Sequence, residues 1–339
     1  MRRSWYCNAM RPFAFVLLFV SLLPAADQQF FELKDLRLAS GARLAACRIG
    51  YRTFGALNAA RDNAVIFPTW FSGSSADLEQ FFTPEKLIDT RRFFVIAVDA
   101  LGNGVSCSPS NTPGLMPQFT VGDMVQAEYR LVTEHFGLKS AQAVVGISMG
   151  GMQTFEWITR YPGFMRMAVP IIGSPKLTAA DMLLWQAELS AIEAAERCHC
   201  DPRQTMLAVQ AMHQYALYSP GWWLSAQEGA DWPALRRKLE SDAASAMDPR
   251  DWAAQLRAMM AQDVSAHAGG SMARAAALVR AKVLVVVAAQ DHMVNPAPAL
   301  AFAKTAKAQV LQLTGNCGHM ATGCESEKMT PAVRAFLAE

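Results

Sequence analysis

The stretch that decides the fold is Gly146-Ile147-Ser148-Met149-Gly150, a G-x-S-x-G pentapeptide. The residues before it, Gln142-Ala143-Val144-Val145, form an apolar run typical of a buried strand, and residues 151–157 are typical of the start of a helix. Between a strand and a helix, this pattern makes a tight turn that lifts the serine hydroxyl above the sheet. Glycines are needed there because a Cβ would clash with neighbouring backbone. The sequence therefore predicts a nucleophilic Ser148, the alternative being a glycine-rich turn with an inert serine.

Two later segments supply the partners that a nucleophilic serine requires. Residues 282–288 form a continuous apolar run suited to a buried parallel strand, and Asp291 follows on the loop at its end. A second short strand is expected over residues 309–313, and it leads to His319 in a glycine-containing loop. Both side chains are therefore expected at the carboxyl edge of the sheet, where active sites form in open α/β sheets.

The division of labour among these residues follows from their acid–base chemistry. A serine hydroxyl is a weak nucleophile at neutral pH, so an imidazole must accept its proton. Of the six histidines, we expect His319 to do this because of its position after a strand. A buried carboxylate then stabilises the imidazolium, and we expect Asp291 to be that group. The alternatives are that His319 is an exposed loop residue and that Asp291 only caps the next helix, with Asp263 and Asp248 as the other candidate acids.

The oxyanion that forms during such a reaction needs two backbone N–H donors. One is expected from Met149, directly after the nucleophile, and the other from a loop that follows an earlier strand. Residues 63–68 form that strand and residues 69–75 form the loop. We favour the amide of Phe71, with Trp70 as the neighbouring alternative.

Further motifs extend over much of the chain. They include Tyr51-Arg52-Thr53-Phe54-Gly55-Ala56-Leu57-Asn58, residues 63–74, residues 88–96 and residues 121–162 with their Ser-Met-Gly-Gly-Met-Gln core. On these motifs the chain resembles the homoserine O-acetyltransferase family of the α/β-hydrolase superfamily, from about residue 44 to 160 and again from 282 onward. The resemblance implies an α/β-hydrolase fold with a mostly parallel central sheet flanked by helices. It also implies acyl transfer through an acyl-serine, with Ser148, Asp291 and His319 at the family's triad positions.

The departures from that family concern substrate recognition. The acetyltransferases carry an arginine in the inserted helical region that holds the amino-acid carboxylate, whereas residues 206–219 contain no arginine. Without a guanidinium, the most direct way to bind a carboxylate is lost. Met320 stands where the family has an acid after the histidine, and residues 99–106 differ from the family's glycine- and serine-rich loop. We therefore expect the chemistry to be retained and homoserine recognition to be lost.

The chain divides into four parts by pattern. Residues 1–26 have the basic start, apolar core and small-residue exit of a secretory signal peptide. Residues 27–175 and 281–339 are expected to form the two parts of the hydrolase core. Residues 176–280 have helical periodicity and many Met and Trp residues, so we expect a helical lid between two core strands. These large apolar residues are expected to form mainly the lid's own core, with an acyl pocket as the alternative role.

Export bears on the acceptor of the acyl group. The alternatives to a cleaved signal are an uncleaved N-terminal anchor and a more compact signal starting at Met10. Acetyl-CoA is a cytoplasmic metabolite, so an exported, periplasmic or secreted enzyme has water as its available acceptor. Hydrolysis is therefore favoured over transfer to homoserine.

Composition limits the partners. The 339-residue chain has a net charge of +2, which becomes about −1 once a signal with three arginines is removed. With no basic run, nucleic acid and anionic membranes are not expected as partners, and stable membrane association after signal cleavage is not expected either. A small-molecule ester is the expected partner. The sequence leaves open whether the chain forms a homodimer.

Six of the seven cysteines remain after the signal, which contains Cys7. An even number in an exported protein is compatible with disulfides, but the pairing cannot be deduced from sequence. Cys317 and Cys324 flank His319, so a bridge from either would stiffen its loop. Cys198-His199-Cys200 lacks the second pair of ligands that a structural zinc site needs, so a disulfide or free thiols are favoured over a metal.

These observations predict a serine hydrolase that cleaves small or medium carboxylic esters without a metal or another cofactor. The alternatives are an acyl-CoA-dependent O-acyltransferase and a catalytically silent binding protein of the same fold. The complete set of serine, acid and histidine argues against the silent protein.

Overall fold

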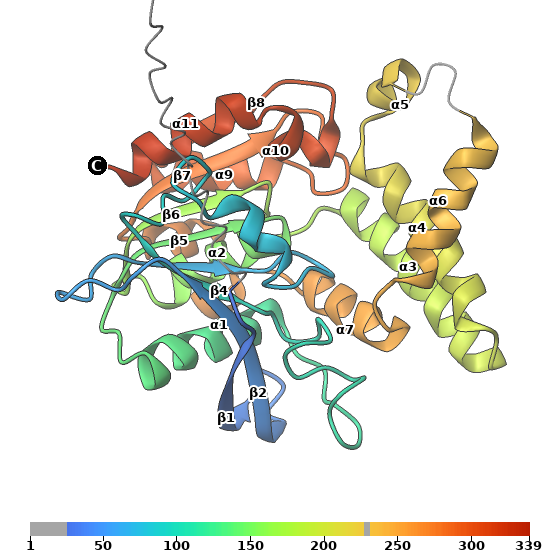
Figure 1. Ribbon diagram of the computed structural model, residues 1–339, viewed down its shortest axis with the longest axis horizontal. Helices are drawn as coiled ribbons and strands as arrows, with labels where there is room; N and C mark the ends of the chain where they lie inside the picture. Colours follow the sequence, from blue (N-terminus) through green and yellow to red (C-terminus); the bar gives the residue numbers. More distant parts are fainter. Residues whose placement is uncertain (1–25, 227–230) are drawn as a thin grey trace, which may run out of the picture.

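A computed structural model describes residues 26–226 and 231–339. The predicted signal peptide and Cys7 lie outside the described residues, apart from Ala26. Within the described residues, one eight-stranded sheet has the order β1-β2-β4-β3-β5-β6-β7-β8 (Figure 1). Its strands are β1 (Gln29–Arg37), β2 (Arg43–Phe54), β3 (Ala64–Pro68), β4 (Phe94–Val98), β5 (Ala141–Ile147), β6 (Met165–Ile171), β7 (Lys282–Ala288) and β8 (Gln309–Leu313).

The sheet is parallel from β4 to β8, whereas β1 pairs antiparallel with β2 and β2 pairs antiparallel with β4. This arrangement confirms the expected mostly parallel sheet. The predicted strands at residues 282–288 and 309–313 coincide with β7 and β8. A continuous apolar run identified β7 because both of its faces are covered, whereas β8 lies at the edge of the sheet and is mostly exposed.

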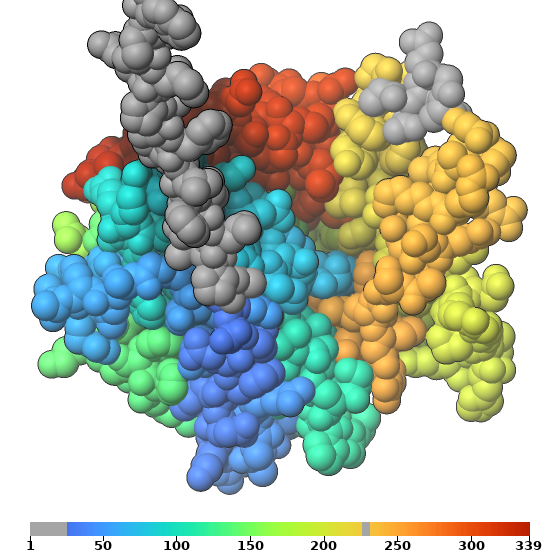
Figure 2. Space-filling model, viewed as in Figure 1, coloured from blue at the N-terminus to red at the C-terminus, as the bar shows by residue number. Residues whose placement is uncertain are grey.

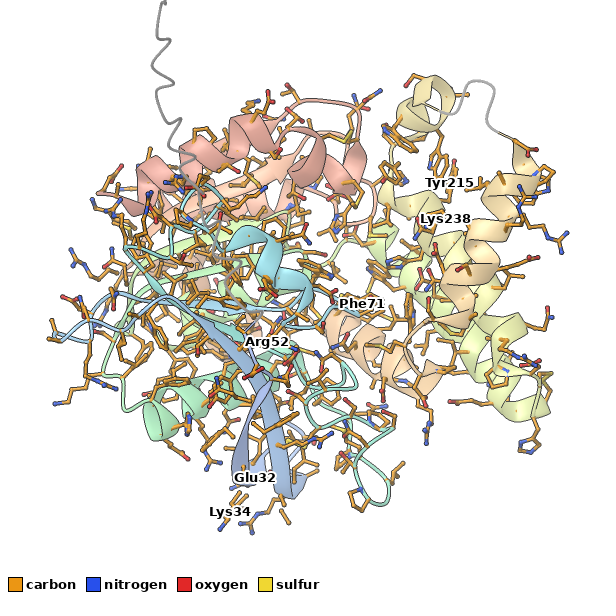
Figure 3. All side chains as sticks on the ribbon, viewed as in Figure 1. Glu32, Lys34, Arg52, Phe71, Tyr215 and Lys238 are labelled. Carbon is orange, nitrogen blue, oxygen red and sulfur yellow. A yellow bond between two sulfur atoms is a disulfide. The ribbon has the colours of Figure 1, made fainter. Side chains whose placement is uncertain are left out.

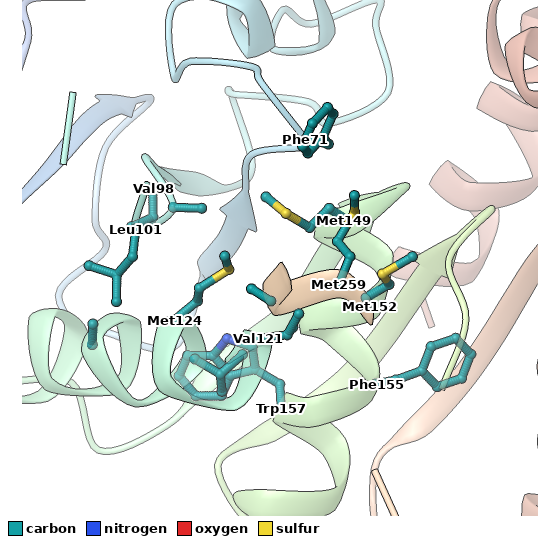
Figure 4. Close-up of a cluster of buried hydrophobic side chains, with 14 of the residues drawn as sticks. Phe71, Val98, Leu101, Val121, Met124, Met149, Met152, Phe155, Trp157 and Met259 are labelled. Carbon is teal, nitrogen blue, oxygen red and sulfur yellow. The ribbon is translucent and has the colours of Figure 1, made fainter. Parts of the chain in front are cut away.

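Alternate residues of the central strands enter two different hydrophobic cores. Ile66 and Val144 belong to one cluster, whereas Val65 and Val145 belong to the other. The first cluster, part of which is shown in Figure 4, is covered by α1 (Val121–Arg130), α2 (Met149–Arg160) and α9 (Ala297–Ala306). The second is covered by the short helix η1 (Asp77–Phe81) and by α11 (Ser326–Leu337). The sheet therefore has a helical layer on each face, which confirms the predicted α/β-hydrolase fold.

A helical excursion leaves the core after β6 and returns at β7. It contains α3 (Ala179–Cys198), α4 (Pro202–Leu217), α5 (Pro220–Ala226), α6 (Trp232–Ala244), α7 (Pro249–Met260), η3 (Ala266–Ala268) and α8 (Met272–Ala277). Helices α3, α4 and α6 stand beside the core as a separate lobe (Figures 1 and 2). In contrast, α8 packs against α9 of the core. The last helix of the excursion therefore contributes to the core rather than to the lobe.

Candidate active site

Ser148 lies in a strained turn between β5 and α2. Its φ of 58° and ψ of −119° are rare for a residue with a side chain. The two glycines of the motif make the turn possible: a Cβ on Gly146 would lie 2.2 Å from the carbonyl oxygen of Gly150, and a Cβ on Gly150 would lie 2.6 Å from that of Pro68. The backbone is packed too closely for any side chain at either position. The turn therefore holds the hydroxyl of Ser148 in one place.

The structure places Ser148, His319 and Asp291 in hydrogen-bond contact. Nε2 of His319 lies 2.8 Å from Oγ of Ser148, and Nδ1 of His319 lies 2.6 Å from Oδ2 of Asp291. An ionised carboxylate can only accept hydrogen bonds, so Nδ1–H donates to Asp291. Nε2 of the neutral ring is then an acceptor for the serine hydroxyl. The three side chains lie as a nucleophile, a base and an orienting acid require.

Asp291 is itself held in place by backbone donors. Its Oδ1 accepts hydrogen bonds of 2.9 Å from the backbone N–H groups of Met293 and Val294. Both Asp291 and His319 are only 5% exposed, so their contact is shielded from water. Asp291 thus orders its own loop and contacts the imidazole, whereas the next helix, α9, begins after Pro296 without a side-chain cap from Asp291.

The two other candidate acids lie elsewhere. Asp263 pairs with Lys176 at 2.6 Å. Asp248 caps α7 and pairs with Arg250 at 2.8 Å, and this hydrogen bond holds the pKa of Asp248 below its ordinary value. Neither carboxylate contacts His319 in the described structure, whereas Asp291 does.

The loop carrying Phe71 is fixed from two sides. Gln153 of α2 donates from Nε2 to the carbonyl of Thr69 at 2.9 Å. The backbone N–H of Ser72 donates to Oε1 of Gln255 in α7, also at 2.9 Å. Within residues 26–226 and 231–339, the backbone N–H groups of Phe71 and Met149 donate to no protein acceptor. Two amides thus remain available for an oxyanion, and their role there stays a prediction.

A cavity of about 550 Å³ opens over Ser148 and His319. Its wall comes from the Phe71 loop, from α3, α4 and α7 of the excursion, and from the segment after His319. Figure 3 shows Phe71 at the boundary between core and excursion. Among the described residues, no arginine lines the cavity, although Lys86 does. The loop at residues 99–106 does not line it either, and it meets the Phe71 loop through Asn103, which donates to the carbonyl of Gly73.

The histidine loop is closed by a disulfide between Cys317 and Cys324, on either side of His319. Glu325 reinforces the loop by accepting hydrogen bonds from the backbone N–H groups of Thr314 and Gly315, at 3.1 and 2.8 Å. Ser219, at the end of α4, donates from its hydroxyl to the carbonyl of Asn316. The position of His319 therefore depends on a covalent bridge as well as on the helical excursion.

The remaining described cysteines also form disulfides, Cys47 with Cys107 and Cys198 with Cys200. The Cys198–Cys200 bridge agrees with the disulfide reading of that motif and leaves neither thiolate free for a metal. In the part of the chain that the structure describes, no group of three or more His, Cys, Asp or Glu residues could hold a metal ion.

A buried carboxylate behind the cavity wall was not foreseen from the sequence. Glu188 of α3 is fully buried, and it accepts hydrogen bonds from Nδ1 of His213 in α4 and from Nε1 of Trp252 in α7. A signal was present in the sequence, because Glu188 stands within the apolar helical stripe of Trp185, Leu189 and Ile192. A carboxylate at such a position is buried and therefore needs hydrogen-bond donors nearby.

Comparisons with known proteins agree with the site geometry. The sequence pattern of the α/β-hydrolase fold family matches residues 63–322. The chain is 31% identical to ethyl acetate hydrolase of Pseudomonas veronii over 281 residues, which cover 78% of this chain and 80% of that protein. The structure of an acetylester hydrolase from Corynebacterium glutamicum superposes with a TM-score of 0.85 at 26% identity, covering 92% of this chain and 95% of the other. Homoserine O-acetyltransferase of Thermobifida fusca is 34% identical over 199 residues, which is 52% of each chain.

Proposed function

We infer that this chain, which belongs to the α/β-hydrolase family, is a serine hydrolase that cleaves carboxylic esters. The observation that carries this conclusion is the contact of His319 with both Ser148 and Asp291 beneath the cavity. Similarity to an ethyl acetate hydrolase and to an acetylester hydrolase supports it at the level of the whole chain. The residue roles below are our proposal.

In the first half of the reaction, Oγ of Ser148 attacks the ester carbonyl while Nε2 of His319 takes its proton. Asp291 keeps Nδ1 protonated and stabilises the imidazolium that results. The negative charge that develops on the carbonyl oxygen meets the backbone N–H groups of Phe71 and Met149. His319 then gives its proton to the departing alcohol, which leaves an acyl group on Ser148.

In the second half, water replaces the alcohol. His319 removes a proton from the water as it attacks the acyl-serine, and returns that proton to Oγ of Ser148 when the acid is released. No step requires a metal or an organic cofactor. The cavity volume of about 550 Å³ suits a small or medium ester, since pockets for small molecules begin at roughly 300 Å³.

Acyl transfer is the second candidate, because homoserine O-acetyltransferase of Thermobifida fusca matches about half of the chain. The structure weighs against transfer to an amino acid. Helix α4, which contains most of the arginine-free stretch, contributes Gln210, His213, Gln214 and Leu217 to the cavity. Arg203, at the start of α4, is exposed and pairs with Asp201. Among the described residues that line the cavity, a carboxylate-bearing acceptor would therefore meet Lys86 but no guanidinium.

Parallel assays separate hydrolysis from transfer. The first measures p-nitrophenyl acetate turnover with and without homoserine, and the second measures CoA release from acetyl-CoA in the presence of homoserine. We expect ester hydrolysis that homoserine does not accelerate, and CoA release at the background rate. Homoserine-dependent CoA release faster than ester hydrolysis would overturn the assignment.

We also propose how the chain is organised and where it acts. Residues 1–26 serve as an export signal, residues 27–175 and 281–339 form the hydrolase core, and residues 176–280 form the lid. Among the described residues, no helix is long and apolar enough to span a bilayer. Export to the periplasm or medium rests on the sequence of residues 1–26. Mass spectrometry of the mature N-terminus would test it, with cleavage near residue 26 as the expected result.

A further inference from the structure

We propose that Gln255, on α7 of the helical excursion, is a positioning residue for the oxyanion site. Gln255 is fully buried and does not line the cavity, so it acts through the turn that presents the N–H of Phe71. The inference rests on the proposed esterase function and extends it. The excursion then contributes to stabilising the transition state in addition to forming a wall of the cavity.

The direction of the Phe71 N–H is set by a tight turn over residues 70–73. The turn is closed by a hydrogen bond of 3.1 Å from the backbone N–H of Gly73 to the carbonyl of Trp70. The carbonyl of Trp70 and the N–H of Phe71 belong to the same trans peptide, so they point in opposite directions. Because the carbonyl points to Gly73, the N–H of Phe71 points away from the turn. This oxyanion donor is therefore correctly directed only while the turn is intact.

The turn contains a residue in an unfavourable conformation. Ser72, its third residue, has a φ of 61°, and glycine or asparagine usually fills this position when φ is positive. Rotation of the peptide between Phe71 and Ser72 would return Ser72 to a negative φ. The same rotation would reverse the direction of the Ser72 N–H. The observed turn therefore needs a contact that holds this N–H in place.

Gln255 makes that contact. Its Oε1 accepts a hydrogen bond of 2.9 Å from the backbone N–H of Ser72, and its Nε2 donates to the carbonyl of Leu101 at 3.0 Å. One partner is a donor and the other an acceptor, so a single orientation of the amide satisfies both. Rotation of the Ser72 N–H would leave Oε1 of this buried amide without its donor, which is unfavourable. Gln255 thus stabilises the turn in the form that directs the N–H of Phe71.

Helix α7 is itself anchored to the core on both sides of this contact. It lies between the core and the lobe of α3, α4 and α6 (Figure 1). One turn before Gln255, Asp251 accepts hydrogen bonds from the backbone N–H and the hydroxyl of Ser110, at 2.8 and 2.5 Å. Trp252 packs edge-on against Phe71, with ring centres 4.6 Å apart. The excursion therefore holds Phe71 by its ring and, through Gln255, by its backbone turn.

The loop at residues 99–106 supports the same turn from the core. Leu101 supplies the carbonyl that orients Gln255, and Asn103 donates from Nδ2 to the carbonyl of Gly73 at 3.0 Å. A Cβ on Gly102 would lie 3.1 Å from Cγ of Gln255, so the loop packs closely against this side chain. The stretch that differs from the acetyltransferases thus acts on the oxyanion turn without lining the cavity.

Gln255→Met tests the proposal, because methionine keeps the length of the side chain and removes both hydrogen bonds. We expect kcat/KM for p-nitrophenyl acetate to fall at least about 10-fold, since a displaced oxyanion donor acts on the transition state. Titration with a fluorophosphonate counts the active sites, so a misfolded fraction does not distort the values.

Two ketones of the same chain length separate positioning from a general structural effect. The carbonyl carbon of 1,1,1-trifluoro-2-heptanone is attacked by Oγ of Ser148, whose proton passes to His319, and the carbonyl oxygen becomes an oxyanion. 2-Heptanone is the unactivated comparison, which binds without this adduct. We expect the Ki of the trifluoromethyl ketone to rise in Gln255→Met by about the factor that kcat/KM loses. The Ki of 2-heptanone should stay within about twofold of the wild type, because no oxyanion forms.

Gln262→Met is the matched control. Gln262 is also buried, lies just after α7 and donates from Nε2 to a core carbonyl, that of Met152 at 3.4 Å. It therefore joins the excursion to the core without contacting the Phe71 turn. This variant should keep kcat/KM and both Ki values of the wild type.

Two results in Gln255→Met would overturn the inference: kcat/KM within about twofold of the wild type, or equal weakening of both ketones. If Gln255→Met does not fold, Gln255→Asn is measured against the same limits, because its amide is one methylene too short to reach both Ser72 and Leu101. A wild-type protein that neither cleaves p-nitrophenyl acetate nor binds the trifluoromethyl ketone more tightly than 2-heptanone would instead contradict the proposed function.

Discussion

The buried carboxylate of Asp181 joins the first turn of α3, in the helical excursion, to the loop that carries Asp291. Its Oδ1 accepts a hydrogen bond of 2.9 Å from the backbone N–H of Asn295, four residues after Asp291. Its Oδ2 accepts from the backbone and hydroxyl of Thr178, the N-cap residue of α3, at 2.7 and 2.9 Å. One side chain thus caps a helix of the excursion and fixes the excursion against the loop that carries Asp291.

Asp181→Ala should weaken both stability and catalysis. The change leaves a partly buried N–H of Asn295 without an acceptor and removes a capping box, so we expect a loss of about 1–3 kcal/mol in unfolding free energy. Because the Asp291 loop also loses an anchor, kcat/KM for p-nitrophenyl acetate should fall several-fold. Asp201→Ala is the control, because Asp201 caps α4 at the surface and contacts Arg203 instead of the active-site loop. Equal losses of kcat/KM in both variants would contradict a specific effect of Asp181 on the loop that carries Asp291.

Gly150→Ala should strongly lower kcat, although the substitution adds only a methyl group. The added methyl would lie 2.6 Å from the carbonyl oxygen of Pro68, directly before the Phe71 loop, so the turn at Ser148 or this loop must shift. We expect kcat to fall at least about 100-fold, since small misplacements at a reacting centre are costly. Gly163→Ala provides a comparison, because the nearest atom to its Cβ would lie 4.0 Å away. Retained kcat in Gly150→Ala would show that the turn tolerates a side chain.

The double substitution Cys317→Ser/Cys324→Ser should affect catalysis and stability together. The disulfide closes the short loop that contains His319, and a bridge of this kind contributes on the order of 2 kcal/mol. A looser imidazole should also lower kcat several-fold. Cys198→Ser/Cys200→Ser removes a bridge at the end of α3, away from the catalytic cavity, and should leave kcat unchanged. An unchanged kcat in the Cys317/Cys324 variant together with a lower kcat in the Cys198/Cys200 variant would contradict this expectation.

Glu128 should make stability depend on pH. Burial raises the pKa of this carboxyl from 4.5 to about 8, against the opposing effect of the hydrogen bond from Trp157. Between these values the folded protein holds a proton that the unfolded chain has released, so stability falls as pH rises, by up to about 1.4 kcal/mol per unit. Glu128→Gln removes this contribution. Urea denaturation between pH 5 and 8 should give a flatter profile for the variant, and parallel profiles would disprove the expectation.

The sheet and the reacting side chains were predictable because their signals are local. Ser148 lies between a strand and a helix, and Asp291 and His319 each follow a short strand. Parallel strands bring their carboxyl ends to one edge, so chain order alone indicates that these loops meet. The approach of Ser148, Asp291 and His319, which are far apart in the sequence, was thus predictable from three short local patterns.

The lid contacts were not predictable in the same way. Periodicity shows which face of a helix is buried but not which helix it meets, so the contact of Glu188 with His213 and Trp252 could not be deduced. The pairing of the cysteines was equally open, because it depends on which loops approach each other in space. The sequence also does not show that residues 99–106 lie outside the cavity wall.

The central claim is that Ser148 is the nucleophile and that His319 activates it. Intact-protein mass spectrometry after treatment with a fluorophosphonate tests this most directly, with peptide mapping to locate the adduct. We predict one adduct per folded chain on Ser148, no adduct in Ser148→Ala, and labelling slowed at least about 100-fold in His319→Ala. Folded wild-type protein that takes up no label, or Ser148→Ala that labels like the wild type, would contradict the account.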